Sequence, residues 1–316
     1  MKKMQFYLAP MEEVTGYVYR NVYHSMFHNM DKYFTPFIAP TQKKILKTRE
    51  RKEVAPEHNQ GRMVVPQILT NHAEQFLDTC SMLAELGYNE VNLNLGCPAA
   101  TVVSKKKGSG FLDDPMKLDR FFETVFEKIS KLPENEKLRI SVKTRIGIEF
   151  PEEFEDILKV YNRYPIYELI IHPRLQKDFY KNHPNREVFA KALEQSVHPV
   201  CYNGDIFTKE DYEVFCNRFP KVERIMLGRG VVANPGLVRQ IQTGQPITTA
   251  ELKEYHDRLY AGYREALDSE KDALFKMKEV WFYLGKMFPD SEKELNRIKK
   301  ANRPEDYREA VRRVFD

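Results

Sequence analysis

The chain has 316 residues, 42% of them hydrophobic, which is enough to bury the core of one large domain and of a smaller one. Its net charge of +4, from 50 basic and 46 acidic residues, is too small to indicate nucleic-acid binding by itself. No run of about 18 apolar residues is present, so we expect a soluble, cytoplasmic protein that does not enter a membrane.

Short apolar runs alternate with polar or glycine-rich loops and with amphipathic stretches of helical period. Eight of the runs are predicted strands: Gln5–Ala9, Tyr33–Ile38, Met63–Leu69, Glu90–Leu95, Arg139–Thr144, Tyr167–His172, Pro199–Tyr202 and Arg224–Leu227. Helical stretches follow most of them, including Ala73–Leu86, Met116–Ile129, Phe154–Tyr161 and Lys209–Phe215. Strands that alternate with helices predict a parallel sheet, and eight such units predict a TIM (β/α)8 barrel.

After about Thr248, helical patterns follow one another with no strand between them, including Leu252–Leu267 and Ala273–Phe288. We therefore predict a barrel domain in residues 1–245 and a small all-α helical bundle in residues 246–316. Basic residues crowd the end of this segment, at Arg297, Lys299, Lys300, Arg303, Arg308, Arg312 and Arg313. The pattern leaves open whether they form a binding surface or an ordinary solvated face.

The four cysteines form neither a C-x-x-C pair nor the spacing of a zinc site, so we expect no disulfide and no metal. Helical patterns around Cys80 and Cys216 favour packing roles, whereas Cys97 and Cys201 lie near predicted strand ends. The stretch Asn94-Leu95-Gly96-Cys97-Pro98 describes a strand that runs into a tight turn with a thiol at its tip. A free cysteine is most often a small buried hydrophobe, but this one is placed to do chemistry.

The active site of a TIM barrel lies at the C-terminal ends of its strands. Residues that are capable of function gather at these ends. In chain order they are Pro10-Met11, Gln67, Asn94 and Cys97, Lys143 and Arg145, His172 and Arg174, Asn203-Gly204-Asp205, and Gly228-Arg229-Gly230. The last two segments are typical of phosphate sites, because glycine lets backbone N–H groups approach the oxygens and Arg229 adds a charge. Each residue alone has a structural explanation, but together they predict a mouth for a flat, phosphate-bearing cofactor.

These motifs resemble those of the flavin-dependent tRNA dihydrouridine synthases along nearly the whole chain. The matching segments are Ala9-Pro10-Met11, Asn94-Leu95-Gly96-Cys97-Pro98-Ala99, Gly108-Ser109-Gly110-Phe111-Leu112, Val142-Lys143-Thr144-Arg145-Ile146-Gly147, Ile171-His172-Pro173-Arg174, Asn203-Gly204-Asp205-Ile206 and Met226-Leu227-Gly228-Arg229-Gly230. The resemblance implies a TIM barrel that binds FMN, a helical domain that helps to hold tRNA, and NADPH as the reductant.

By the same resemblance, Cys97 is the acid that protonates C5 of a uracil ring while hydride passes from flavin N5 to C6, and Asn94 holds the uracil. Lys143 would lie beside the N1/C2 end of the flavin, where a cation stabilises the reduced ring. Further contacts with the flavin ring are implied for Pro10, Met11, Gln67 and His172. The ribityl and phosphate site is implied for Asn203, Gly204, Asp205, Gly228 and Arg229.

A uracil in folded RNA must leave its stack to reach such a mouth, so we expect a surface that grips the RNA backbone. Loop cations supply candidates: Lys43, Lys44, Lys47, Arg49, Arg51, Lys52, Lys105-Lys106-Lys107, Arg145, Arg174 and Lys177. From these we assign Lys105, Arg145 and Arg174, together with Asn94, to substrate binding. The alternative for the loop lysines is that they only promote solubility.

The chain departs from the usual family pattern at three places, with Glu12-Glu13-Val14, Thr35-Pro36-Phe37 and Lys181-Asn182. These departures concern the choice of substrate more than the type of reaction. Two other functions stay open: an FMN barrel that acts on a small molecule, like a dihydroorotate dehydrogenase, and an RNA-binding relative without turnover. The first does not explain the helical C-terminal segment, and Cys97, Lys143 and His172 argue against the second. The sequence indicates neither which uridine is reduced nor whether NADPH or NADH is preferred, and we expect a monomer.

Overall fold

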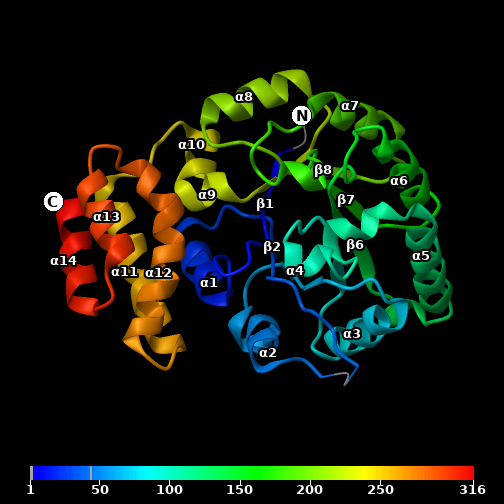
Figure 1. Cartoon of the computed structure of the whole chain (residues 1–316), viewed down its shortest axis with the longest axis horizontal. Helices are drawn as coiled ribbons and strands as arrows, with labels where there is room; N and C mark the ends of the chain where they lie inside the picture. Colours follow the sequence, from blue (N-terminus) through cyan, green and yellow to red (C-terminus); the bar gives the residue numbers. More distant parts are fainter. Residues whose placement is uncertain (1–2, 43–44) are drawn as a thin grey trace.

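A sheet of short parallel strands curves into a barrel at the centre of the molecule (Figure 1). The computed structural model describes residues 3–42 and 45–316. Its strands are β1 (Gln5–Leu8), β2 (Lys32–Phe34), β3 (Val64–Val65), β4 (Gln67–Ile68), β5 (Glu90–Leu95), β6 (Arg139–Thr144), β7 (Glu168–Ile171), β8 (Val200–Tyr202) and β9 (Arg224–Leu227). They follow one another in the order β3-β2-β1-β9-β8-β7-β6-β5-β4. The two ends of this order meet at Pro66, which confirms the predicted barrel.

The prediction of one continuous strand over Met63–Leu69 is wrong, because Pro66 divides it into β3 and β4. Proline has no N–H group to donate to a neighbouring strand. Its carbonyl still accepts a hydrogen bond from the Asn92 N–H group, at 2.9 Å. The chain therefore changes partner at this residue: β3 pairs with β2, and β4 pairs with β5.

The second predicted strand, Tyr33–Ile38, is also too long, since β2 ends at Phe34. The Thr35 hydroxyl accepts a hydrogen bond from the Gln67 N–H group, and Pro36 cannot continue the ladder. Ile38 forms only an isolated bridge to Ile68. This short β2 leaves the segment after it free to form the rim of the barrel.

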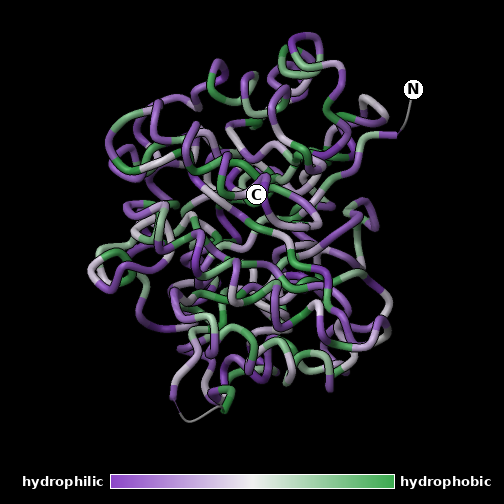
Figure 2. Tube along the Cα trace, turned by 90° about the vertical axis from the view of Figure 1, so that its right-hand side faces the viewer, coloured by the Kyte–Doolittle hydropathy of each residue, from purple (hydrophilic) through white to green (hydrophobic). Residues whose placement is uncertain are grey.

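Helices cover the outside of the barrel (Figure 1). They are α1 (Tyr17–Phe27), α2 (Thr48–Val54), α3 (Ala73–Glu85), α4 (Ala100–Val103), α5 (Pro115–Ser130), α6 (Glu153–Tyr161), α7 (Arg186–Gln195), α8 (Lys209–Arg218), α9 (Arg229–Ala233) and α10 (Leu237–Thr243). In α5, the Asp114 side chain accepts a hydrogen bond from the Lys117 N–H group, and Pro115 opens the first turn. Hydrophobic and hydrophilic residues alternate along the elements, as expected for helices with one buried face (Figure 2).

Four helices complete the chain: α11 (Thr249–Ala266), α12 (Glu270–Leu284), α13 (Glu292–Lys300) and α14 (Pro304–Phe315). A buried chain of hydrogen bonds joins three of them, because the Trp281 Nε1–H group donates to Tyr307 Oη, which lies 2.8 Å from His256 Nε2. These four helices pack on the barrel, where α11 contacts α1 and α12 contacts α9. In the described part of the chain, no helix is long and apolar enough to cross a membrane.

Candidate active site at the barrel mouth

The inside of the barrel is arranged in layers because alternate strand residues face inward. Lys32, Glu90 and Glu168 form buried ion pairs at the N-terminal end. An apolar layer follows, made of Tyr7, Ala9, Phe34, Val65, Ile170, Cys201 and Met226. Above it, at the C-terminal end, stand Gln67, Asn94, Lys143, His172, Asn203 and Gly228. The barrel is thus closed below, and the predicted site residues of the strands meet at one open mouth.

Hydrogen bonds to backbone groups hold the turn that carries Cys97. Asn94 Oδ1 accepts hydrogen bonds from the N–H groups of Gly96 and Cys97, at 3.0 and 2.9 Å. The Cys97 carbonyl accepts from the Ser109 N–H and hydroxyl groups, at 3.0 and 2.9 Å. Gly108 has a φ of +57°, and a Cβ there would lie 2.7 Å from the Cys97 carbonyl oxygen. The turn therefore fixes the half-buried thiol without using its sulfur.

Burial is the main influence on the Cys97 thiol, and it raises the pKa above the ordinary value. The carboxylate of Glu12 acts in the same direction, while the Ala99 N–H group and the cations of Lys143 and Arg145 act against it. The raised pKa keeps the thiol protonated at neutral pH. Cys97 can therefore donate a proton.

Gln67 connects Asn94 to the interior of the barrel. Its Oε1 accepts a hydrogen bond from Asn94 Nδ2, and its Nε2 donates to Asn92 Oδ1, both at 2.7 Å. Asn92 in turn donates to the Ser141 hydroxyl, at 3.0 Å. This ladder of buried amides fixes the orientation of Asn94, whose Nδ2 keeps one hydrogen for a ligand.

Lys143 and His172 supply an ammonium and a neutral imidazole to the mouth. Lys143 lies beside Asn94 in the register of β5 and β6, and within the described residues its ammonium has no hydrogen bond or ion pair. Burial, followed by the charge of Arg145, lowers the pKa of Lys143 to about 8. The pKa of His172 lies well below its ordinary value, again mainly through burial. His172 Nε2 accepts from Arg174 at 2.9 Å, so its proton is on Nδ1.

The predicted phosphate segments meet in an ion-pair cluster. The carboxylate of Asp205 pairs with both Arg174 and Arg229. Two cations and one carboxylate give the cluster a net positive charge, which suits an anionic group of a ligand. The Arg229 guanidinium also lies over the ring of Tyr180, 4.4 Å from its centroid.

Arg145 and Arg174 are both almost fully buried. The Arg145 guanidinium donates to the carbonyls of Gly96, Leu175 and Phe179, at 3.0, 2.6 and 2.8 Å. Each arginine therefore joins several loops of the mouth. Their predicted contact with the substrate stays a prediction.

The remaining predicted cofactor residues border the mouth near β1, β8 and β9. Met11 packs beside Gly228, where a Cβ would lie 3.4 Å from the Met11 sulfur. Pro10 is the preceding residue of the same half-buried loop. Asn203 donates from Nδ2 to the Met226 carbonyl, at 2.9 Å. Gly204 has no room for a side chain, because a Cβ there would collide with the Tyr202 ring.

Of the predicted rim cations, Lys43 and Lys44 lie outside the described residues. The exposed Lys105 lies in the loop between α4 and the 3-10 helix Gly108–Asp113, and its neighbour Lys106 pairs with Asp113. Lys177 pairs with Glu149. The structure thus distinguishes cations that are already neutralised from those that are available.

The unusual Glu12-Glu13 pair lies at the rim between the barrel and the last helices. Arg49 of α2 bridges both carboxylates, at 2.7 Å each. Glu13 also pairs with Lys276 of α12. These ion pairs connect the mouth with the C-terminal helices.

Sequence reasoning missed several residues that support the site. Ser109 holds the Cys97 turn, Tyr180 covers Arg229, and Asn92 and Ser141 continue the amide ladder. The alternation of Asn92 and Asn94 within an apolar strand is a signal that could have revealed the ladder. The carbonyl partners of Arg145 left no such signal, because two of them lie about thirty residues further along the chain.

The family model described as dihydrouridine synthase (Dus) matches residues 7–315 of this chain. The chain belongs to the dihydrouridine synthase family. One relative, a tRNA-dihydrouridine(16) synthase of Aquipseudomonas alcaligenes, is 30% identical over 244 residues, which cover 75% of each chain. A probable tRNA-dihydrouridine synthase of Staphylococcus epidermidis is 33% identical over 239 residues, which cover 73% of this chain and 69% of the relative. The family predicted from the motifs is thus confirmed.

Solved structures share the barrel at much lower identity. The old yellow enzyme homologue from Zymomonas mobilis has a TM-score of 0.55 and 12% identity, covering 77% of this chain and 90% of that chain. Morphinone reductase has a TM-score of 0.52 and 10% identity, covering 77% and 87%. These similarities concern the fold. Within the described residues, no group of three or more His, Cys, Asp or Glu side chains could hold a metal ion.

Proposed function

We propose that this protein reduces the C5=C6 bond of specific uridines in tRNA to dihydrouridine, with FMN as its cofactor and NADPH as the reductant. The observation that carries the proposal is the half-buried Cys97 thiol at the mouth of a dihydrouridine synthase barrel, where the Lys143 ammonium has no partner among the described side chains. The names of the relatives support tRNA as the substrate.

The residues of the mouth fit FMN. Lys143 has no partner among the described side chains and can neutralise the negative charge of a reduced ring. His172 can donate from Nδ1, and Gln67 has one hydrogen left on Nε2. Pro10, Met11 and Gly228 would border the ring, whereas Asn203, Gly204, Asp205 and Arg229 would hold the ribityl chain and the phosphate. FMN, when bound, supplies the hydride that C6 of the uracil receives.

Cys97 completes the reduction by donating the thiol proton to C5 of the uracil. The C5=C6 bond becomes a single bond, and the thiolate then recovers a proton from solvent. Asn94 would hold the uracil through the free hydrogen of Nδ2. Lys105, Arg145 and Arg174 would support RNA binding, the first through phosphate and the two buried arginines by fixing the loops of the mouth.

We further propose that residues 246–316 act as a tRNA-holding domain behind the catalytic barrel of residues 1–245. The ion pair of Glu13 with Lys276 supports this role, because it holds the C-terminal helices next to the mouth. The cytoplasmic location, the monomeric state and the use of NADPH as the reductant stay predictions.

The decisive experiment incubates the purified protein with FMN, NADPH and tRNA from cells that lack this protein. We expect dihydrouridine to form at particular positions, detected by mapping the reduced bases in the tRNA. Protein that binds FMN and is reduced by NADPH but leaves every uridine unchanged would contradict the proposed substrate. A colourless protein that cannot be reconstituted with FMN would contradict the proposed cofactor.

A further inference from the structure

A second cavity, of about 490 Å³, opens beside the barrel mouth. The β1–α1 loop, α1 and α2 line one side, and the C-terminal end of α11 and the middle of α12 line the other. Its walls include Tyr17, Val18 and Pro36 from the barrel and Tyr263, Ala266 and Leu267 from the C-terminal helices. Glu13 lines it two residues after Met11 of the proposed flavin site. The cavity is therefore a neighbour of the active site and not a part of it.

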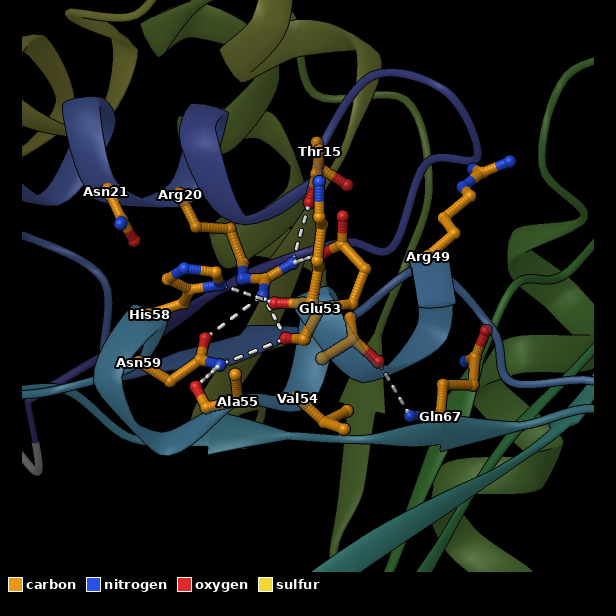
Figure 3. A network of polar contacts seen from close by, with 12 residues as sticks. Thr15, Arg20, Asn21, Arg49, Glu53, Val54, Ala55, His58, Asn59 and Gln67 are labelled. Atoms are coloured by element: carbon orange, nitrogen blue, oxygen red, sulfur yellow. Dashed lines mark hydrogen bonds and ion pairs between the residues drawn. The ribbon is translucent and has the colours of Figure 1, made fainter. Parts of the chain in front are cut away.

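The floor of the cavity carries a hydrogen-bond acceptor to which no described residue donates. Glu53 Oε2 accepts from the buried guanidinium of Arg20 at 2.8 Å, and the Glu53 side chain is 12% exposed (Figure 3). Within the described residues, no group donates to Glu53 Oε1. A Cβ at position 16 would lie 2.9 Å from Oε1, so Gly16 is the residue that leaves this oxygen accessible.

The rim of the cavity carries three cations, two of which are paired with carboxylates. Arg49, Lys52 and Lys276 line it, and Lys52 has no ion pair among the described residues. Arg49 and Lys276 share the carboxylate of Glu13, and Arg49 also pairs with Glu12. A ligand for this cavity therefore combines an apolar, flat body, hydrogen-bond donors at its buried edge and an anionic group at its outer end.

We propose that the cavity binds a guanine nucleotide of the tRNA, unstacked near the target uridine. The inference rests on the proposed function, which supplies tRNA as the substrate. Guanine has two adjacent donors, N1–H and N2–H, on its pairing edge, and both can donate to the two lone pairs of Glu53 Oε1. Adenine and cytosine offer only an amino donor on this edge and uracil only N3–H, each next to an acceptor that would face the carboxylate. Tyr17 and Tyr263 provide aromatic surface for the base, and the rim cations suit its phosphate.

Direct titration of the full chain tests the cavity independently of catalysis. The probes are 5′-GMP, 5′-AMP and 5′-UMP, followed by isothermal calorimetry. We expect GMP to bind about tenfold more tightly than AMP or UMP, the ratio that corresponds to a hydrogen bond to a charged group. Glu53→Gln should reduce this preference. Equal affinity for the three nucleotides would overturn the proposal.

A second variant separates binding from folding, because Glu53 also pairs with Arg20. Ala266→Trp fills the cavity from α11 and should abolish GMP binding, whereas Ala261→Trp, on an exposed position of the same helix, should leave it unchanged. GMP binding that survives Ala266→Trp would place the site elsewhere and overturn the proposal.

The same pair of variants identifies the source of the nucleotide. If guanine belongs to the tRNA, Ala266→Trp should raise KM for tRNA about tenfold and leave kcat and the reduction of bound flavin by NADPH unchanged. GMP binding without any change in KM for tRNA would indicate a free nucleotide and overturn the RNA assignment. A wild-type protein that binds GMP but never reduces tRNA would contradict the proposed function instead.

Discussion

Cys97 is fixed by its backbone and kept neutral by its surroundings. Asn94 and Ser109 hold its N–H and carbonyl groups, and burial raises its pKa. Burial outweighs the Ala99 N–H group and the cations of Lys143 and Arg145, so the arrangement disfavours the thiolate that a nucleophilic attack would need. The surroundings of Cys97 therefore favour its role as a proton donor.

Removal of the thiol should separate catalysis from cofactor binding. We expect Cys97→Ala to bind FMN normally and to lose about 100-fold or more in tRNA turnover, since general acid catalysis contributes at least that factor. Dihydrouridine formation at saturating tRNA measures the loss. Cys216→Ala, which changes a half-buried cysteine on α8, is the control. Normal turnover by Cys97→Ala would exclude Cys97 as the acid.

Lys143 should make FMN binding depend on pH. Its pKa of about 8 means that the side chain is an ammonium below pH 8 and a neutral amine above it. If the flavin needs this cation, the Kd for FMN should rise about tenfold from pH 7 to pH 9. Quenching of flavin fluorescence measures the Kd. Lys143→Met should bind FMN weakly with a flat profile between these pH values, and an unchanged pH dependence in this variant would contradict the assignment.

The sequence predicts well where single site residues lie, but it does not predict their hydrogen-bond partners. Lys143, His172 and Asn203 stand at strand ends, and parallel strands bring such ends together. Arg145 illustrates the opposite case, because its guanidinium binds carbonyls of Leu175 and Phe179, about thirty residues further along. An arginine at a strand end can be an exposed cation or a buried side chain that holds loops together. The sequence is the same in both cases, and only the packing of the loops distinguishes them.

At the scale of elements, α2 is held in place by one buried arginine. Arg20 of α1 donates to Glu53 Oε2 at 2.8 Å, to the Glu53 carbonyl at 2.9 Å and to Asn59 Oδ1 at 3.0 Å (Figure 3). Arg49, on the same helix as Glu53, points away from this network. The clamp therefore positions a short helix that presents cations at the rim.

Breaking this clamp should cost stability. We expect Arg20→Met to lower the free energy of unfolding by about 3 kcal/mol, because it leaves the Glu53 carboxylate without its buried partner. Urea denaturation measures the difference. Arg51→Met, on an exposed position of α2, should stay within about 0.5 kcal/mol of the wild type. A similar effect of both variants would mean that the clamp has no special role.

The elements themselves were predictable where one signal dominates. The alternation in Glu90–Leu95 and the helical period of Pro115–Ser130 both agree with the structure. The stretch Met63–Leu69 does not reveal two strands by its pattern, because apolar residues lie on both sides of Pro66 and Gln67 and the whole stretch has the length of one strand. Whether a proline ends a strand or merely changes its partner depends on the neighbouring strands, which the local sequence does not contain.

At the scale of the whole molecule, separate loops bring cations together at the rim. The pKa of Lys107 is lowered by partial burial and then by the charges of Lys105 and Lys47, which places three ammonium groups from two loops near one another. The modest net charge of the chain conceals this local concentration. Such a cluster is suited to the closely spaced phosphates of an RNA backbone.

The lysine cluster should control the salt dependence of tRNA binding. We expect the double variant Lys105→Ala, Lys107→Ala to weaken binding and to reduce the slope of log Kd against log salt by about one to two, since each neutralised phosphate contributes slightly less than one. Filter binding at several salt concentrations measures the slope. Lys106→Ala is the matched control, because its ammonium is already paired with Asp113. If Lys106→Ala changed the slope as strongly as the double variant, total charge and not the arrangement of free cations would govern binding.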